Sequence, residues 1–299
     1  MQRRTFTAVS IAALTGLCTV WGSAQAASQL KLQVYNPGTQ SMFAVSSELV
    51  TGAREAILID AQFQKNDAQK LVALIKASGK KLTTIYISHS DPDFYFGLDT
   101  LQAAFPDARI VATPQTVAAI EASKDGKLAF WGPMLKDNAP QKIVVPKVLN
   151  TDHLLLEGQR LAIKGLTGQQ PERSYVWIPG LRAVVGGVVV SANAHVWMAD
   201  TQTPESRAEW QKTLDDIAAL QPRTVVPGHY LLKDGKAPKG LESVRFTADY
   251  LTHFERASAQ TNDSQELIAA MKQRYPGLSG EDGLVLGAKV VKGEMKWPQ

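Results

Sequence analysis

Alternating polar and apolar residues along the chain predict a series of short strands. Successive side chains of a strand point to opposite faces, so a period of two marks a strand with one buried face. The N-terminal part of the chain shows this period at residues 30–35, 42–46 and 56–60. Short apolar runs indicate further strands at residues 84–87, 109–112, 147–149, 153–156, 160–166, 175–178, 183–190 and 224–226.

Apolar residues three or four positions apart predict helices between these strands. The first helix runs from Asn66 to Ala77 and is stopped by the following Ser-Gly pair. The mixed stretch 124–150, which contains several prolines, is interpreted as a connection or a lid over a site. This order favours an α/β fold in which two sheets pack back to back with helices outside. Other helices are expected at residues 94–105, 204–220, 240–259 and 264–274.

The first 26 residues have the composition of an export signal. Arg3 and Arg4 precede an apolar run from Ala8 to Trp21, and residues 24–26 offer the small side chains that a signal peptidase reads. The paired arginines also match a twin-arginine signal, and both kinds of signal stay open. We therefore expect a periplasmic or secreted protein formed by residues 27–299.

Composition narrows the class of protein further. The one cysteine, Cys18, lies inside the signal, so the mature chain has no disulfide and no thiolate chemistry. Loss of Arg3 and Arg4 leaves 30 basic against 28 acidic residues, a net charge of +2. This balance favours neither a nucleic-acid nor a membrane partner. Roughly 270 residues can form one α/β domain, which we expect at 27–299 with a C-terminal helical extension at 231–299.

Two segments carry side chains suited to chemistry. His89, Asp91 and Asp93 follow a buried strand at intervals of two, so all three can face one side of an extended stretch. His229 follows another apolar strand about 140 residues later. Imidazole and carboxylate groups are ordinary ligands of zinc, and iron or manganese also accept them. Alternatively, Asp93 caps a helix that starts at Phe94, and the two roles can coexist.

Three landmarks, in this order, resemble the metallo-β-lactamase superfamily. They are the strand 56–60, the strand that leads into residues 88–97, and residues 225–229, which end in Pro-Gly-His. The resemblance covers roughly residues 30–230. It implies an αββα four-layer sandwich with one or two metal ions in the groove between the sheets. Members of this family hydrolyse β-lactams, thioesters, lactones, phosphoesters and other substrates through a metal-bound hydroxide.

The resemblance places the family motif His-x-His-x-Asp-His on residues 89–94. His89 and Asp93 match the motif, whereas Asp91 stands for its second histidine and Phe94 for its last. The final metal histidine of the family matches His229. The remaining two ligand positions fall on Gln169, a neutral amide, and on Gly187, which has no side chain.

The resemblance therefore implies one metal ion, expected to be Zn2+, in place of the usual pair. Its ligands would be two imidazoles and two carboxylates, namely His89, Asp91, Asp93 and His229. The metal would lower the pKa of a bound water, and Asp93 would orient or deprotonate that water as the catalytic residue. His195 follows the position of the missing aspartate and is a further candidate ligand; the alternative is a packed histidine in an aromatic-rich loop.

Two functions fit these residues. The first is an exported metal-dependent hydrolase of a small ester, lactone, amide or related molecule, with a small-molecule substrate as its partner. The alternative is a non-catalytic binding or scaffold protein that has lost its metal, with Phe94 and Gln169 filling the groove. Retention of both histidines favours the hydrolase, and the residues at positions 94 and 187 favour the scaffold.

Overall fold

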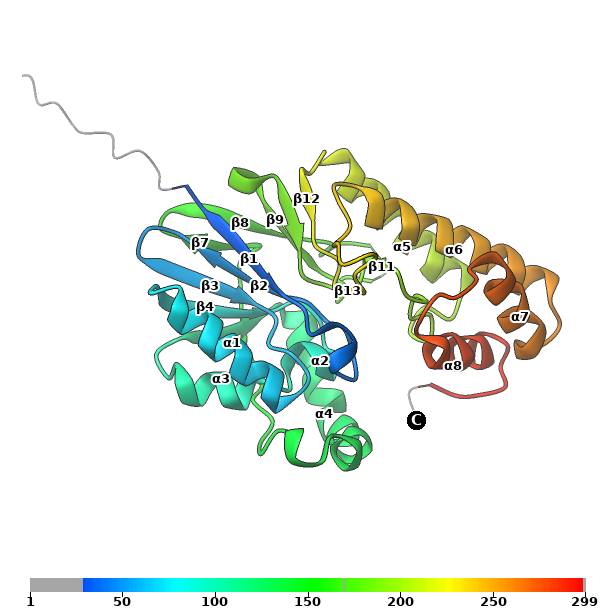
Figure 1. The fold of residues 1–299 in the computed structure, drawn as a ribbon, viewed down its shortest axis with the longest axis horizontal. Helices are drawn as coiled ribbons and strands as arrows, with labels where there is room; N and C mark the ends of the chain where they lie inside the picture. Colours follow the sequence, from blue (N-terminus) through cyan, green and yellow to red (C-terminus); the bar gives the residue numbers. More distant parts are fainter. Residues whose placement is uncertain (1–28, 169, 298–299) are drawn as a thin grey trace, which may run out of the picture.

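The computed structural model describes residues 29–168 and 170–297, and the candidate export signal lies outside these residues. A six-stranded mixed sheet forms the first half of the fold (Figure 1). Its first three strands are antiparallel and the later ones parallel. The strands, in spatial order, are β1 (Lys31–Tyr35), β2 (Ser47–Thr51), β3 (Glu55–Ile59), β4 (Lys81–Ile87), β5 (Arg109–Ala112) and β6 (Lys147–Val148).

A five-stranded sheet forms the second half of the fold. Most of its neighbouring strands are antiparallel, and only β10 and β12 pair in parallel. A separate parallel pair joins β11 (Ser191–Ala192) to β13 (His229–Tyr230). In spatial order the five strands are β12 (Thr224–Val225), β10 (Ala183–Val185), β9 (Tyr175–Ile178), β8 (Gln159–Lys164) and β7 (His153–Leu156).

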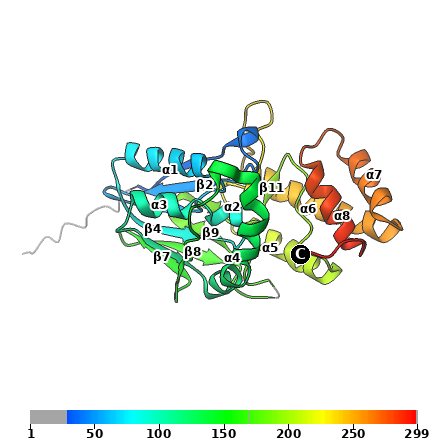
Figure 2. The same cartoon turned by 90° about the horizontal axis from the view of Figure 1, so that it is seen from below.

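Helices cover the outer faces of both sheets, as Figures 1 and 2 show. Against the first sheet lie α1 (Lys65–Ala77), α2 (Pro92–Tyr95), α3 (Leu98–Ala104) and α4 (Pro114–Leu135). Against the second lies α5 (Pro204–Ala219), with α6 (Glu242–Gln260) beside it. Helix α7 (Ser264–Arg274) packs on α6 and α8 (Glu281–Val291) packs on α7, to the right in Figure 1. Short 3-10 helices occur at Gly38–Gln40, Lys136–Asn138 and Pro179–Leu181. None of the helices in the described ranges is both long and apolar enough to span a bilayer.

Alternation along the strands divides the apolar residues among three core clusters. In β3, Leu58 belongs to the cluster beneath α1 and α3, whereas its neighbours Ile57 and Ile59 belong to the cluster between the sheets. Tyr86 of β4 likewise meets Val176 of β9 in the central cluster. The central cluster, with a helical layer outside each sheet, confirms the α/β sandwich predicted from the sequence.

Several element boundaries differ from the sequence predictions. The strand predicted at 42–46 is wrong: only Val45 forms a bridge there, and the strand begins at Ser47. The strand predicted at 183–190 ends at Val185, because Gly186 and Gly187 adopt φ angles of 71° and 80° that no strand allows. The connection predicted at 124–150 begins as the second half of α4, and α8 was not predicted.

Candidate active site

The two sequence segments with candidate ligands meet at one edge of the sandwich. Residues 88–93 follow the C-terminal end of β4, and His229 opens β13. The loop before β2 holds the second segment in place. Val45 pairs with His229, the Ser46 amide donates to the carbonyl of Gly228 at 2.8 Å, and the Ser46 hydroxyl donates to that of Pro227 at 2.8 Å.

His229 and Asp93 form a direct pair across the groove. The Nε2 atom of His229 lies 2.6 Å from Oδ2 of Asp93. Burial lowers the pKa of His229, but the carboxylates around it, Asp93 first, outweigh burial and raise it above its ordinary value. The Asp93 side chain is buried, whereas that of His229 stays 30% exposed. A ligand can therefore reach the imidazole while its partner carboxylate is held inside the protein.

Asp93 does not cap a helix, contrary to the alternative considered from the sequence. Helix α2 begins at Pro92, so Asp91 is its N-cap residue and Asp93 lies in the first turn. Proline suits the first helical position because its fixed φ matches the helix and its missing N–H needs no partner there. The turn directs the Asp93 carboxylate to His229.

His89 and Asp91 form a second pair, which includes a cation from α4. The Nδ1 atom of His89 accepts the Asp91 amide N–H at 3.2 Å and lies 3.4 Å from Asp91 Oδ2. The Lys127 ammonium donates to Asp91 Oδ1 at 3.1 Å and to the Ser90 carbonyl at 2.9 Å. Burial raises the pKa of Asp91, but His89 and Lys127 outweigh burial and hold it well below its usual range.

Phe94 packs against the imidazoles of both pairs. Its ring meets that of His89 edge-on at 5.6 Å between centroids and that of His229 at 5.4 Å. Phe94 itself is fully buried. The aromatic ring therefore takes up space to which the family motif assigns a further metal histidine.

These contacts do not form a metal site from the four predicted ligands. Each carboxylate already binds a side chain of the protein, Asp91 with Lys127 and Asp93 with His229. Among residues 29–168 and 170–297, no three histidine, cysteine, aspartate or glutamate side chains are placed to hold a metal ion together. Gln169 lies outside the described residues. As they stand, the residues present fit two ion pairs better than the coordination sphere of one zinc ion.

Gly187 occupies a place where the backbone leaves no room for a side chain. A Cβ atom there would lie 2.2 Å from the carbonyl oxygen of Ser174, and φ is 80°. The Gly187 N–H donates to the Ser88 hydroxyl at 2.8 Å, which fixes the turn. A Cβ atom on Gly228 would in turn lie 2.0 Å from the Gly187 carbonyl. An aspartate at position 187 would need a different backbone.

Asp60 supports the segment that carries His89. Its carboxylate accepts the Ser88 amide at 2.8 Å and the Ser88 hydroxyl at 2.6 Å. Burial raises the pKa of Asp60 to about 7, although both bonds from Ser88 lower it. Glu48 of β2 is buried nearby, and burial followed by the charge of Asp60 raises its pKa well above its usual value. Asp60 and Glu48, which lie beneath the site, are therefore more easily protonated than ordinary carboxyl groups.

Two further charged residues at the groove were not predicted from the sequence. Arg173 is buried, its guanidinium stacks on the Trp210 ring at 4.1 Å, and its Nε atom has no partner among the described residues. Burial lowers its pKa, while Asp200 and Asp91 are the carboxylates that oppose this most strongly. Asp200 accepts indole N–H groups from Trp197 at 2.6 Å and from Trp297 at 2.8 Å. Arg173 and Asp200 lie in loops, where the sequence has no periodic pattern that would identify them as site residues.

His195 lies away from the two pairs. Its Nδ1 atom lies 2.9 Å from the hydroxyl of Tyr250 in α6, and its amide donates to the carbonyl of Ser279 at 2.7 Å. Burial lowers its pKa. The structure places His195 as a packed, hydrogen-bonded residue, which is the alternative considered from the sequence.

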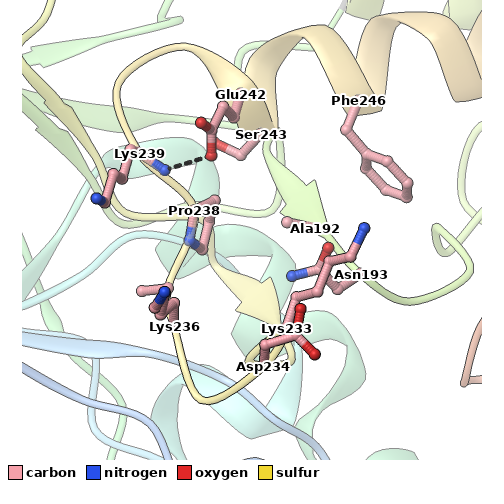
Figure 3. Close-up of a pocket in the computed structure, with 11 residues that line it drawn as sticks. Ala192, Asn193, Lys233, Asp234, Lys236, Pro238, Lys239, Glu242, Ser243 and Phe246 are labelled. Atoms are coloured by element: carbon pink, nitrogen blue, oxygen red, sulfur yellow. Dashed lines mark hydrogen bonds between the residues drawn. The ribbon is translucent and has the colours of Figure 1, made fainter.

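A surface pocket of about 420 Å³ lies elsewhere, at the start of α6 (Figure 3). Lys233, Lys236 and Lys239 line it together with Asp234 and Glu242, and the Lys239 amide donates to Glu242 at 2.9 Å. None of the four candidate ligands lines this pocket. Its mixed charges select no ligand class, so the two histidine–aspartate pairs remain the candidate site.

Comparison with solved structures finds the same fold in bacterial proteins of low sequence identity. A metallo-β-lactamase family protein from Thermus thermophilus matches with a TM-score of 0.59 and 17% identity over 88% of this chain and 91% of its own. A metallo-β-lactamase from Hirschia baltica matches with a TM-score of 0.53 and 16% identity over 75% and 94%. A metallo-β-lactamase from Pontibacter korlensis matches with a TM-score of 0.52 and 17% identity, over 75% of this chain and 93% of its own.

The sequence comparisons give the family directly. No curated protein matches the chain significantly. The family model described as the metallo-beta-lactamase superfamily matches residues 42–229, which is more than half of the chain and includes every predicted metal ligand. Together with the sandwich fold, this match establishes that the chain belongs to the metallo-β-lactamase superfamily.

Proposed function

We propose that this protein is a hydrolase of a small ester, lactone or amide, acting in the groove between its two sheets. One observation carries the proposal: the His229–Asp93 pair, 2.6 Å across, joins the two halves of the fold at the groove. A carboxylate that holds one ring nitrogen of a histidine leaves the other for acid–base work. With Nε2 bound to Asp93, Nδ1 of His229 is the ring nitrogen left for a substrate or water.

The reaction follows from this arrangement as a proton cycle on His229. In its neutral form the imidazole takes a proton from a water molecule while the water oxygen attacks the substrate carbonyl carbon. Asp93 stabilises the imidazolium that results. The imidazolium then gives its proton to the leaving oxygen or nitrogen as the bond to that atom breaks. Since Asp93 raises the pKa of His229, the rate should increase with pH as His229 loses its proton.

The single zinc ion predicted from the sequence takes no part in this mechanism. A zinc ion bound to His89, Asp91, Asp93 and His229 would supply an activated water and polarise the substrate carbonyl. Such an ion would compete with Lys127 for the Asp91 carboxylate and with Asp93 for Nε2 of His229. The same is true for iron or manganese, because they use the same donors.

A binding or scaffold function is the second candidate. The observation that favours it is the buried ring of Phe94, which contacts both imidazoles and reduces the space beside them. In that case the two pairs would stabilise the fold and the groove would bind a small molecule without changing it.

A substrate panel separates the two functions. The wild-type protein, Asp93→Asn and Asp152→Asn are assayed with ester, lactone, amide, phosphoester and β-lactam substrates. Asp152 is the matched control, because it pairs with His153 at 2.9 Å on the surface of β7. Hydrolysis of one class by the wild type and by Asp152→Asn, but about 100-fold slower in Asp93→Asn, supports the proposal. No hydrolysis in any class supports the scaffold.

Export is a separate proposal that the described residues leave open. We propose that residues 1–26 direct the protein to the periplasm or the medium, on the strength of Arg3, Arg4 and the apolar run behind them. Fractionation of cells that express the full chain and a chain lacking residues 2–26 tests it. Export of the full chain alone is the expected result, and equal distribution of both would contradict it.

A further inference from the structure

We infer that the side-chain cations Lys127 and Arg173 replace a metal ion in this groove, and that Lys127 acts there as a fixed electrophile on a substrate carbonyl. The role of Lys127 toward substrate rests on the proposed hydrolase function. The exclusion of metal is independent of that function, because it follows from the contacts around Asp91 alone.

The Lys127 ammonium lies among groups of the predicted metal-binding segment. The ammonium donates hydrogen bonds to two oxygen atoms of this segment, the Ser90 carbonyl at 2.9 Å and Asp91 Oδ1 at 3.1 Å. The opposite carboxylate oxygen, Asp91 Oδ2, faces His89 at 3.4 Å. The ammonium therefore stands beside an imidazole and a carboxylate, the groups that would coordinate zinc.

Arg173 is a second buried cation whose charge Asp91 senses. Its guanidinium is buried against Trp210 and is 5% exposed as a residue. Asp200 and Asp91 are its strongest acidic neighbours. Arginine stays protonated in proteins, so a divalent ion entering beside Asp91 would be repelled by Lys127 at close range and by Arg173 from farther away.

The backbone leaves no room for an acidic side chain at position 187, where the family has a further metal ligand. Gly187 has no room for a Cβ atom, which would lie 2.2 Å from the Ser174 carbonyl. Phe94 fills the space between this turn and the histidines, since a Cβ atom on Gly228 would lie 3.7 Å from its ring. Neither residue has a side-chain donor atom for a metal.

The Lys127 side chain is not fully enclosed by the protein. It is 21% exposed, and it belongs to α4, which lies beside α2 in Figures 1 and 2. A positive charge fixed by two protein oxygens suits the developing negative charge on a carbonyl oxygen during hydrolysis. His89 and Asp91 are then positioning residues, because they act through the ammonium.

Zinc binding by the full chain tests the exclusion of metal without any assay of activity. Zinc content after purification, and titration with ZnCl2 in a calorimeter, are measured for the wild type, Lys127→Ala and Lys124→Ala. Lys124 is the matched control, one turn earlier on α4, where it pairs with Glu121 and Asp125. We expect no stoichiometric zinc in the wild type or in Lys124→Ala, and at least about tenfold tighter zinc binding in Lys127→Ala, because Asp91 is freed.

Two results would overturn the inference about metal. One is a full equivalent of zinc in the wild type that is lost in His89→Ala. The other is zinc binding by Lys127→Ala that is no tighter than that of the wild type, because the cation would then not be what excludes the metal. Circular dichroism establishes that each variant is folded before its titration counts.

The electrophilic role of Lys127 is tested with a substrate found in the panel. Lys127→Met should reduce kcat at least about 100-fold with little change in KM, and Lys127→Arg should restore part of the loss. An unchanged kcat in Lys127→Met would refute the role. If the panel shows no hydrolysis at all, the hydrolase function and this role fail together, whereas the zinc result stands by itself.

Discussion

The Nε2 atom of His229 lies 2.6 Å from the Oδ2 atom of Asp93, although 136 residues separate the two in the sequence. The chain brings them together by placing the end of β4 and the start of β13 at the same edge of the sandwich. A pair that joins the two halves of a fold in this way is expected to contribute to stability.

Loss of the Asp93 charge should destabilise the folded protein measurably. In Asp93→Asn the amide can still make one hydrogen bond to His229, but the charge interaction is lost. A hydrogen bond between charged groups contributes roughly 1.5–3 kcal/mol when partly buried, so we expect a decrease of about 1–2 kcal/mol in the free energy of unfolding. Urea denaturation measures it. Asp152→Asn removes an exposed pair and should lower the free energy of unfolding by less than about 0.5 kcal/mol. An equal decrease in both variants would contradict this prediction.

Stability should fall as the pH rises from about 4 to 7, because of Asp60. Its pKa of about 7 in the folded protein exceeds the ordinary value of 3.8. The folded state therefore binds the proton more tightly, and the stabilisation is complete below pH 3.8 and lost as the pH approaches 7. The size of the effect is on the order of a few kcal/mol.

Asp60→Asn isolates that contribution, because asparagine keeps the acceptor for the Ser88 amide and cannot titrate. Chemical denaturation of both proteins between pH 4 and pH 7.5 measures it. We expect a clear decline in the unfolding free energy of the wild type and a flatter profile for Asp60→Asn. Parallel profiles for the two proteins would show that Asp60 does not cause the pH dependence in this range.

Gly187 should tolerate no side chain. Gly187→Ala combines a φ of 80° with a contact of 2.2 Å to the Ser174 carbonyl, so a loss of roughly 3 kcal/mol or more is expected. Gly235→Ala is the matched control, since φ is 70° there and nothing lies within 4 Å. It should cost only about 1 kcal/mol. Melting curves that shift equally for both variants would mean that the turn at Gly187 can move.

The fold could largely be predicted from the sequence, because its strands and helices are periodic. Helix α1 (Lys65–Ala77) and strand β9 (Tyr175–Ile178) follow their hydrophobic patterns closely. Strand β2 was missed, since the buried Glu48 interrupts its pattern with a charge. Helix α8 was missed because Gly283 and Gly287 disfavour a helix locally, while packing against Trp197 and Met198 compensates.

The candidate site could be located from the sequence, but its contacts could not. The strand-end positions of His89 and His229 indicated one groove, and the structure places both against Phe94. The sequence does not show that Asp91 binds a lysine from α4, because that contact depends on how α4 crosses the groove. Whether the four predicted ligands bind a metal ion together stays a prediction, to which the ion pairs offer a physical alternative.

The most direct test of the account is an NMR titration of His229 in the full-length protein as purified. An imidazole paired with Asp93 should titrate with a pKa above its ordinary value of about 6.5, and this pKa should fall in Asp93→Asn. A histidine bound to zinc does not titrate in this range, because the metal occupies the ring nitrogen. A His229 signal that does not titrate until the protein is treated with a chelator would contradict the account, and so would an ordinary pKa that Asp93→Asn leaves unchanged.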